Sequence, residues 1–145
     1  MTLAFWIPGP PRGKGRPKFS TAGGFVRTYT DDATAAYENL VALAAKRAMD
    51  EAGMEPIAEP CSVYVRAEFE VPKSVSAKKR RAMLDGEIEP TKKPDLDNVL
   101  KAVLDGLNKV AFVDDVLVTH IHAVKVYAAN PCVYVAVTPR SKEEQ

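Results

Sequence analysis

Residues 97–127, DNVLKAVLDGLNKVAFVDDVLVTHIHAVKVY, change from a helical pattern to an extended one within a single stretch. Apolar residues recur at intervals of three and four in the first part, which predicts an amphipathic helix over residues 97–110. Asp95 or Asp97 would cap its first turn. Residues 116–127 instead have the composition of a strand. A helix followed by a strand indicates a domain that mixes both. The apolar positions of the helix are Val99, Leu100, Val103, Leu104, Leu107 and Val110.

The rest of the chain adds elements of both kinds on either side of this stretch. We expect strands at residues 3–7, 25–30, 61–71 and 131–139, a long helix from Asp31 or Asp32 to Gly53, and a short cationic helix at 74–86. The strand at 25–30 is a candidate hairpin partner of the first, which would put the basic loop between them at a sheet edge. The turn at 128–131 predicts a terminal hairpin. The predicted fold class is α+β, a single domain over residues 1–145 with a mixed β-sheet flanked by helices.

Composition limits the class of protein. A chain of 145 residues with 46% hydrophobic and 27% charged content suits one globular domain with one core. It contains no apolar run of membrane-spanning length and no leader pattern, so we expect a cytoplasmic protein. Cys61 and Cys132 form no CxxC motif, and we expect both to be thiols that serve in packing.

The net charge of +1 hides a local imbalance. Residues 1–30 hold five basic residues and no acidic one, and residues 73–93 hold seven basic residues against three acidic ones. Such zones suit a phosphate backbone, although a run of charge is also typical of an ordinary solvated face.

Carboxylates are concentrated at the two ends of the predicted helix over 97–110. Asp95 and Asp97 precede it, and Asp114 and Asp115 follow it. Magnesium prefers oxygen ligands and keeps several waters, so two or three carboxylates with substrate phosphate oxygens would form a suitable site. A fourteen-residue helix spans about 21 Å, so the two pairs meet only if the chain turns back along the helix. Lys101 lies one turn from Asp97 and could offset negative charge during phosphoryl transfer.

Each of these residues also has an ordinary structural interpretation. Aspartates before a helix are common caps, and Asp114 and Asp115 could be turn residues. Lys101 could form a surface ion pair with Asp97 or Asp105. Asp105 itself is more typical of a solvated partner than of a metal ligand.

Other candidate residues are set aside on chemical grounds. His120 and His122 share a strand face but have no third nitrogen or sulfur ligand at a recognised spacing, so we leave them out of a zinc site. Phe5 and Trp6 could stack on a base, but a strand of this composition is typical of a core.

The sequence resembles the RusA family of Holliday-junction resolvases, which phages and prophages often carry. The resemblance is carried by KPDLDNVLKAVLDGLN at 93–108 and AFVDD at 111–115, and it extends to PGPPRGKGRPKFS at 8–20 and YTDDATAAYE at 29–38. It covers most of the chain, from about Phe5 to the strand after Asp115, and is weakest over the predicted terminal hairpin and the tail.

This resemblance implies an activity and a set of residues. The expected protein is a homodimer that binds four-way DNA junctions and makes paired symmetric nicks, with Mg²⁺ as cofactor and Mn²⁺ as a substitute. The family's metal carboxylates fall on Asp95, Asp97 and Asp115, and its catalytic lysine falls on Lys101. Asp114 is the alternative third ligand, because adjacent residues on an extended chain point in different directions. The expected phosphate contacts are Arg12, Lys14, Arg16, Lys18, Lys92 and Lys93.

Two other functions stay open at the level of the sequence. One is a metal-dependent nuclease that acts on other branched DNA or on plain duplex. The other is a DNA-binding module without catalysis, in which the carboxylates only cap a helix.

Overall fold

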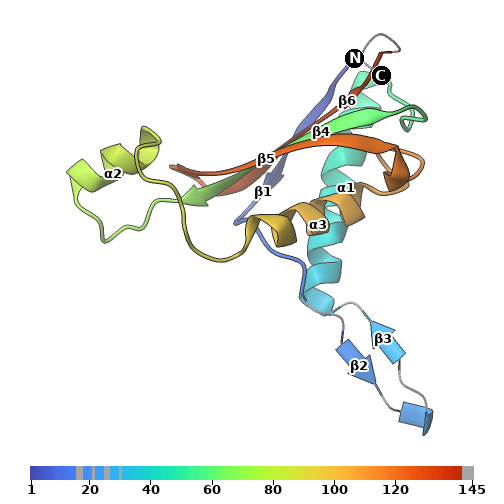
Figure 1. Ribbon diagram of the computed structural model, residues 1–145, viewed down its shortest axis with the longest axis horizontal. Coiled ribbons are helices and arrows are strands. Elements are labelled where there is room, and N and C mark those ends of the chain that lie inside the picture. The colour runs from blue at the N-terminus through green and yellow to red at the C-terminus, as the bar shows by residue number, and fades with distance from the viewer. Residues whose placement is uncertain (16–17, 21, 25–26, 30, 142–145) are drawn as a thin grey trace.

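The computed structural model of the protein describes residues 1–15, 18–20, 22–24, 27–29 and 31–141. The predicted α+β class is confirmed, with a mixed four-stranded sheet and three α-helices in the described part (Figure 1). The strands are β1 (Leu3–Pro8), β2 (Lys18–Ser20), β3 (Arg27–Tyr29), β4 (Cys61–Glu70), β5 (Val118–Ala128) and β6 (Cys132–Pro139). The helices are α1 (Asp32–Ala52), α2 (Ala77–Leu84) and α3 (Leu96–Leu107), with short 3-10 turns η1 (Ala22–Gly24) and η2 (Asp115–Leu117).

The sheet has the strand order β1-β6-β4-β5, so the expected terminal hairpin is wrong. Strand β5 pairs with β4 in parallel, and β6 pairs antiparallel with β4 on one side and β1 on the other. The short connection from Ala128 to Cys132 therefore crosses the end of β4. Alternating apolar residues predict that a segment is a strand, but they do not say which strand lies beside it.

The expected hairpin between the first two strands is also wrong. Strand β3 pairs antiparallel with the three-residue strand β2, which sequence patterns did not predict, and the two form a separate small sheet. This pair projects below the N-terminal end of α1, away from the main sheet (Figure 1). The basic segment of residues 8–15 consequently leads away from the main sheet.

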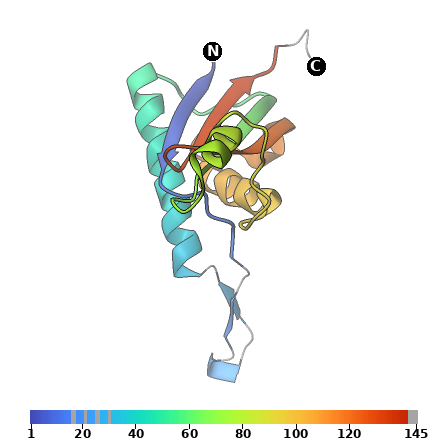
Figure 2. The same ribbon diagram turned by 90° about the vertical axis from the view of Figure 1, so that its left-hand side faces the viewer.

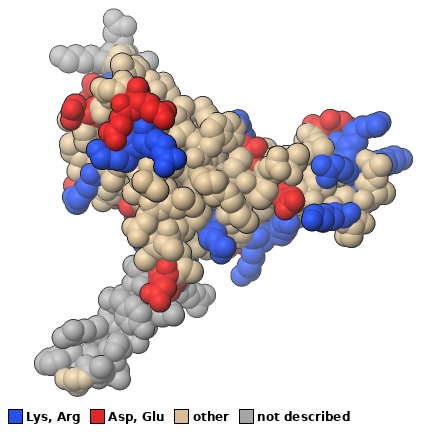
Figure 3. All heavy atoms as spheres, turned by 180° about the vertical axis from the view of Figure 1, so that it is seen from behind, with Lys and Arg blue, Asp and Glu red and all other residues tan. Residues whose placement is uncertain are grey.

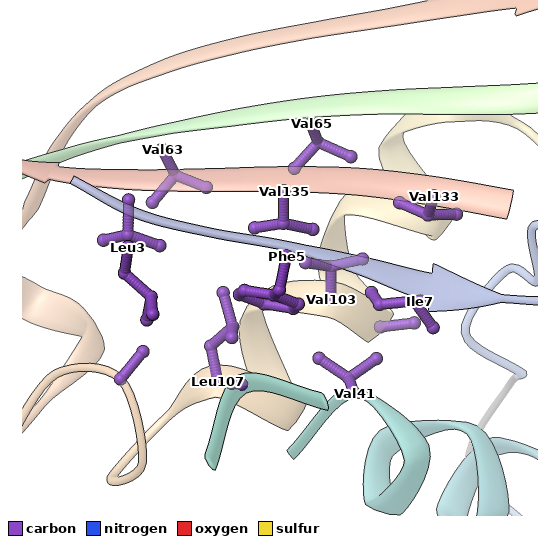
Figure 4. Close-up of a cluster of buried hydrophobic side chains, with 14 of the residues drawn as sticks. Leu3, Phe5, Ile7, Val41, Val63, Val65, Val103, Leu107, Val133 and Val135 are labelled. Atoms are coloured by element: carbon purple, nitrogen blue, oxygen red, sulfur yellow. The ribbon is translucent and has the colours of Figure 1, made fainter. Parts of the chain in front are cut away.

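Helices α1 and α3 cover one face of the main sheet, and the core lies between this face and the two helices (Figure 2). Alternate residues of β1, β4 and β6 point toward the helices, where Val41 of α1 and Val103 and Leu107 of α3 meet them (Figure 4). These strand residues are Leu3, Phe5, Ile7, Val63, Val65, Val133 and Val135. The period-two burial of the strands and the helical spacing of α3 thus supply the two halves of one core.

The opposite face of the sheet is open to solvent, which corrects the expectation for Trp6. Phe5 is buried as expected, but Trp6 points the other way and stays 53% exposed. Its ring lies 4.7 Å from that of Tyr134, and the Arg66 guanidinium lies over the Tyr134 ring at 4.8 Å. Because successive strand residues face opposite sides, only one of two adjacent aromatic residues can enter a one-sided core.

Helices α1 and α3 are close together because Gly106 has no side chain. A Cβ at this position would lie 2.7 Å from Cβ of Val41 and 2.9 Å from the backbone oxygen of Glu38. This close approach brings the exposed edge of α3 beside α1, and it places Asp105 near Glu38.

The bounds of α1 agree with the sequence prediction, whereas α2 is shorter than the predicted 74–86 and α3 ends before residue 110. Asp31 caps α1 by accepting a hydrogen bond from Thr34 N at 2.9 Å, and Gly53 ends that helix in the left-handed conformation. Helix α3 ends at Leu107 and not at residue 110, because Asn108 is extended and Lys109 has a φ of 65°. The chain therefore turns earlier than expected toward Asp114 and Asp115.

Candidate nucleic-acid and metal site

The loop of residues 12–15 is held between the N-terminal ends of α1 and α3. Lys14 N donates a hydrogen bond to the backbone oxygen of Asn98 at 2.9 Å, and Gly15 N donates to Oγ1 of Thr34 at 2.9 Å. A Cβ on Gly15 would lie 2.0 Å from Oδ2 of Asp31, and one on Gly13 would lie 3.1 Å from Cβ of Asn98. The glycines between the basic residues let the loop backbone approach both helices closely.

A surface hollow of about 500 Å³ lies where this loop meets the start of α3. We call it the Asp95 hollow. Its polar lining includes Arg12, Lys14, Asp31, Lys93, Asp95 and Asn98. Two basic zones that are about eighty residues apart in the chain therefore meet beside the first predicted carboxylate. Sequence reasoning did not select Asn98 or Thr34, and no local pattern distinguishes them from ordinary helix residues.

Helix α3 presents its predicted chemical groups on an exposed face. Asp95 occupies the N-cap position, but its side chain makes no capping hydrogen bond. Its carboxylate therefore does not serve as the helix cap that the ordinary structural interpretation assumed. Asp97, Lys101 and Asp105 are all exposed and follow one another at intervals of four residues. They form one line along the helix surface.

Lys14 has partners inside the protein. Its ammonium forms an ion pair with Asp105 and lies 3.4 Å from Oε2 of Glu38. The hydrogen bond to Asp105 is the main reason that the pKa of Lys14 is raised above its ordinary value, although partial burial opposes the shift. Asp105 was expected to be solvated or paired with Lys101, and the structure pairs it with Lys14 across 91 residues. The expected phosphate contact of Lys14 stays a prediction that competes with this ion pair.

The second pair of aspartates lies at the opposite end of α3. Asp114 accepts a hydrogen bond from Val116 N at 3.1 Å, which is the main reason that its pKa is lowered. Asp115 N donates to Oδ1 of Asn108 at 3.0 Å. The pKa of the Asp115 carboxyl is raised, first by its hydrogen bond with Asp114 and further by the negative charges of Asp114 and Asp105. The charged neighbours of Asp115 are therefore at this end of the helix.

The structure separates the predicted metal ligands into two groups. The ten residues from Asp95 to Asp105 span about 15 Å along the helix axis. Asp115 lies near Asp105, toward the C-terminal end of the helix. Across the described part of the chain, no group of three or more His, Cys, Asp or Glu side chains is arranged to hold a metal ion. Asp95 and Asp97 still suit magnesium, which needs only one or two protein carboxylates when phosphate oxygens and waters complete its shell. The assignment of Asp115 as a third ligand stays a prediction.

The remaining sequence candidates lie elsewhere. Arg16, and the side chain of Lys18, are outside the described residues. Lys92 and Lys93 are exposed in the segment before α3. His120 is within 3.0 Å of Oγ1 of Thr119, and His122 stacks on Tyr64 with ring centroids 5.4 Å apart. In the described part of the chain, neither histidine belongs to a group of three or more metal-ligating side chains.

Comparison with known protein families finds a match over nearly the whole chain. The family model described as Endodeoxyribonuclease RusA matches residues 8–138, which include the basic loop, both carboxylate pairs and all four strands of the main sheet in whole or in part. The chain belongs to the RusA family of endodeoxyribonucleases.

A relative of the RusA-family chain is found in Bacillus subtilis (strain 168). It is the uncharacterized protein YqaN, which is 34% identical over 137 residues, or 93% of this chain and 94% of that protein. The similarity thus extends over both proteins almost from end to end. In the described part of this RusA-family member, no helix has the length and apolar character needed to cross a membrane.

Proposed function

We propose that the protein is a magnesium-dependent endonuclease that resolves four-way DNA junctions as a homodimer by paired symmetric nicks. One observation carries the proposal: Asp95, two residues before the exposed Asp97, lines a hollow together with Arg12 and Lys93. Cations that can bind a phosphate are next to carboxylates that can bind a metal. Membership of an endodeoxyribonuclease family supports the same chemistry.

The residues at the start of α3 have distinct proposed roles. Arg12 and Lys93 would hold the backbone phosphate, and the N-terminal end of the helix adds partial positive charge. Asp95 and Asp97 would hold Mg²⁺, which when bound orients the phosphate and lowers the pKa of a water molecule. Lys101, one turn beyond Asp97, would offset negative charge that develops on the phosphate oxygens. Asp115 is the proposed third ligand, with Asp114 as the alternative.

The homodimer is proposed because the reaction has two equivalent halves. A four-way junction has two symmetric strands to cut, and a two-fold enzyme presents one site to each. Mn²⁺ would substitute for Mg²⁺ because both accept oxygen ligands.

The deciding experiment incubates the protein and its Asp97→Asn variant with a mobile four-way junction and Mg²⁺, and maps nicks on all four strands. We expect paired symmetric nicks from the protein, and junction binding without nicks from the variant. Continued cutting by Asp97→Asn would refute the role of this carboxylate. Single or scattered nicks, or cutting of flaps and plain duplex at equal rates, would favour a less selective nuclease.

One observation favours a second candidate, a DNA-binding module without catalysis. Among the described residues of a single chain, no three or more His, Cys, Asp or Glu side chains are arranged to hold a metal ion. Such a module would bind junctions without nicking them in any divalent metal, and Mg²⁺ would not raise its melting temperature.

A further inference from the structure

A second hollow adjoins the Asp95 hollow on the other side of the Lys93–Pro94 segment. Its volume is about 510 Å³, and it shares Pro11, Lys93 and Pro94 with its neighbour. We call it the proline hollow, because Pro10, Pro11, Pro72, Pro94 and Pro131 line it together with Phe69. This volume is within the usual range for a small-molecule site. The two hollows therefore form one continuous surface around the residues that lead into α3.

The proline hollow has an apolar base. Phe69 and Val71 are 5% and 1% exposed, and they come from the end of β4 and the residue after it. Proline rings have no backbone N–H to satisfy, so the walls offer flat apolar surface with few polar groups. Such a surface suits the face of an aromatic ring.

The edge of the proline hollow is basic. Lys73, Lys92 and Lys93 line it and are exposed, whereas Glu70 is the one acidic residue of its lining. Lys92 lies 5.9 Å from the Phe69 ring centroid, and Lys125 lies 5.0 Å from it. Lys125 Nζ also donates a hydrogen bond to the backbone oxygen of Lys92 at 2.5 Å, which ties this segment to β5. Seen from behind, basic side chains gather on α2 and along the lower edge between α2 and the body (Figure 3).

We propose that the proline hollow receives one unpaired nucleotide of branched DNA, with its base against the accessible prolines of the walls and its phosphates against the lysines. This inference rests on the proposed function, because the next phosphate along the strand would enter the Asp95 hollow. Apolar ring surface combined with a basic track is the chemistry that binds single-stranded nucleic acid without sequence preference. A paired base is not available to such a surface unless it leaves the stack, which costs least at an unpaired position. The hollow would therefore favour branch points over continuous duplex.

The test measures equilibrium binding in EDTA, where no cleavage is possible, by fluorescence anisotropy with the full-length protein. Two junction-like DNAs are compared that carry the same phosphates at the branch point, one with an unpaired base there and one with an abasic nucleotide. We expect the base to tighten binding about tenfold, in line with the contribution of one stacked base. Equal binding of the two DNAs, or no binding of either, would overturn the inference.

Variants then locate the effect. Pro72→Ser, at a partly exposed proline of the lining, should weaken binding of the base-containing DNA and leave the abasic DNA unchanged. Lys92→Ala should weaken both by a similar factor through loss of a phosphate contact. The matched control is Lys79→Ala, an exposed lysine of α2 that does not line the hollow, and it should leave the binding of both DNAs unchanged. A base-to-abasic ratio that Pro72→Ser leaves intact in a variant with a native melting curve would count against the hollow.

The proposed function and this inference can fail separately. A base preference in EDTA without any cleavage in Mg²⁺ would support the hollow and refute the nuclease. Paired cleavage in Mg²⁺ without a base preference would do the reverse.

Discussion

The two ends of α3 carry similar pairs of aspartates in very different surroundings. At the N-terminal end, Asp95 lines a hollow with Arg12 and Lys93. At the C-terminal end, Asp115 lies near Asp114, Asp105 and Lys109, and its pKa is raised because the negative neighbours outweigh the lysine. The sequence presents both pairs as metal candidates, but the first pair adjoins a hollow lined by several cations, whereas the second has mainly negative charge around it. The comparison teaches that the partners of a carboxylate, and not its spacing in the chain, distinguish a phosphate site from a region of repulsion.

The largest expected effect comes from removing one carboxylate at each end of α3. Asp97→Asn should lower the rate of junction cleavage by more than about 100-fold, since even the loss of a group that only supports a metal ligand costs about 10- to 100-fold. Asp115→Asn and Asp114→Asn, assayed by the same nick mapping, would identify the third ligand. The control is Asp50→Asn, an exposed residue of α1, which should cleave normally. Equal cleavage by Asp97→Asn and Asp50→Asn would show that the carboxylate of Asp97, at the N-terminal end of α3, has no part in catalysis.

A substitution at Gly106 tests the close packing of α3 against α1 near the C-terminal end of α3. Gly106→Ala should lower the free energy of unfolding by about 1–3 kcal/mol, because the added methyl group meets Val41 and the backbone of Glu38. Urea denaturation measures the change. Leu43→Ala, at a position of α1 that is 56% exposed, should change stability by less than about 0.5 kcal/mol. If both variants unfold alike, the close approach of α1 and α3 is not what holds Asp105 beside Glu38.

The burial of Tyr37 in α1 can be tested by measuring the free energy of unfolding as a function of pH. Burial raises the pKa of Tyr37 to about 12, although the backbone and the positive charge of Arg12 oppose the shift. An unfolded tyrosine loses its proton near pH 10, so between pH 10 and about 12 the folded state binds more protons and stability falls as pH rises. Across this window the wild type should lose roughly 1–3 kcal/mol more than Tyr37→Phe. Parallel stability curves for the two proteins would show that Tyr37 is not shielded from water.

The smallest expected effect is a change in the salt dependence of DNA binding, which distinguishes Lys14 from Arg12 and Lys93. Arg12→Ala and Lys93→Ala should each reduce the slope of log K against log salt by about 0.9, the value for one phosphate contact on B-DNA. Lys14→Ala should change this slope less, because Lys14 is already paired with Asp105 and Glu38. Anisotropy titrations at several salt concentrations give the slopes. A full reduction for Lys14→Ala would mean that DNA displaces the ion pair.

Much of the fold could be predicted from local patterns. The limits of α1 follow from Asp31 and Gly53, and the alternation along residues 61–70 predicts β4. Strand neighbours could not be predicted, because β5 and β6 are close in the chain but β4 lies between them. The candidate site divides in the same way. Motifs indicated Asp95 and Asp97, whereas the ion pair between Lys14 and Asp105 joins residues that no local pattern connects.

The sequence by itself determined the α+β class, the helix that carries the carboxylates and the residues that resemble a nuclease motif. These depend on interactions between residues a few positions apart, such as capping, periodic burial and adjacent charges. The tertiary structure alone decided the strand order, the meeting of Arg12 with Lys93 beside Asp95, and the separation of Asp115 from that hollow. Those arrangements depend on how distant segments pack, as at Gly106, where the lack of a side chain sets the distance between two helices.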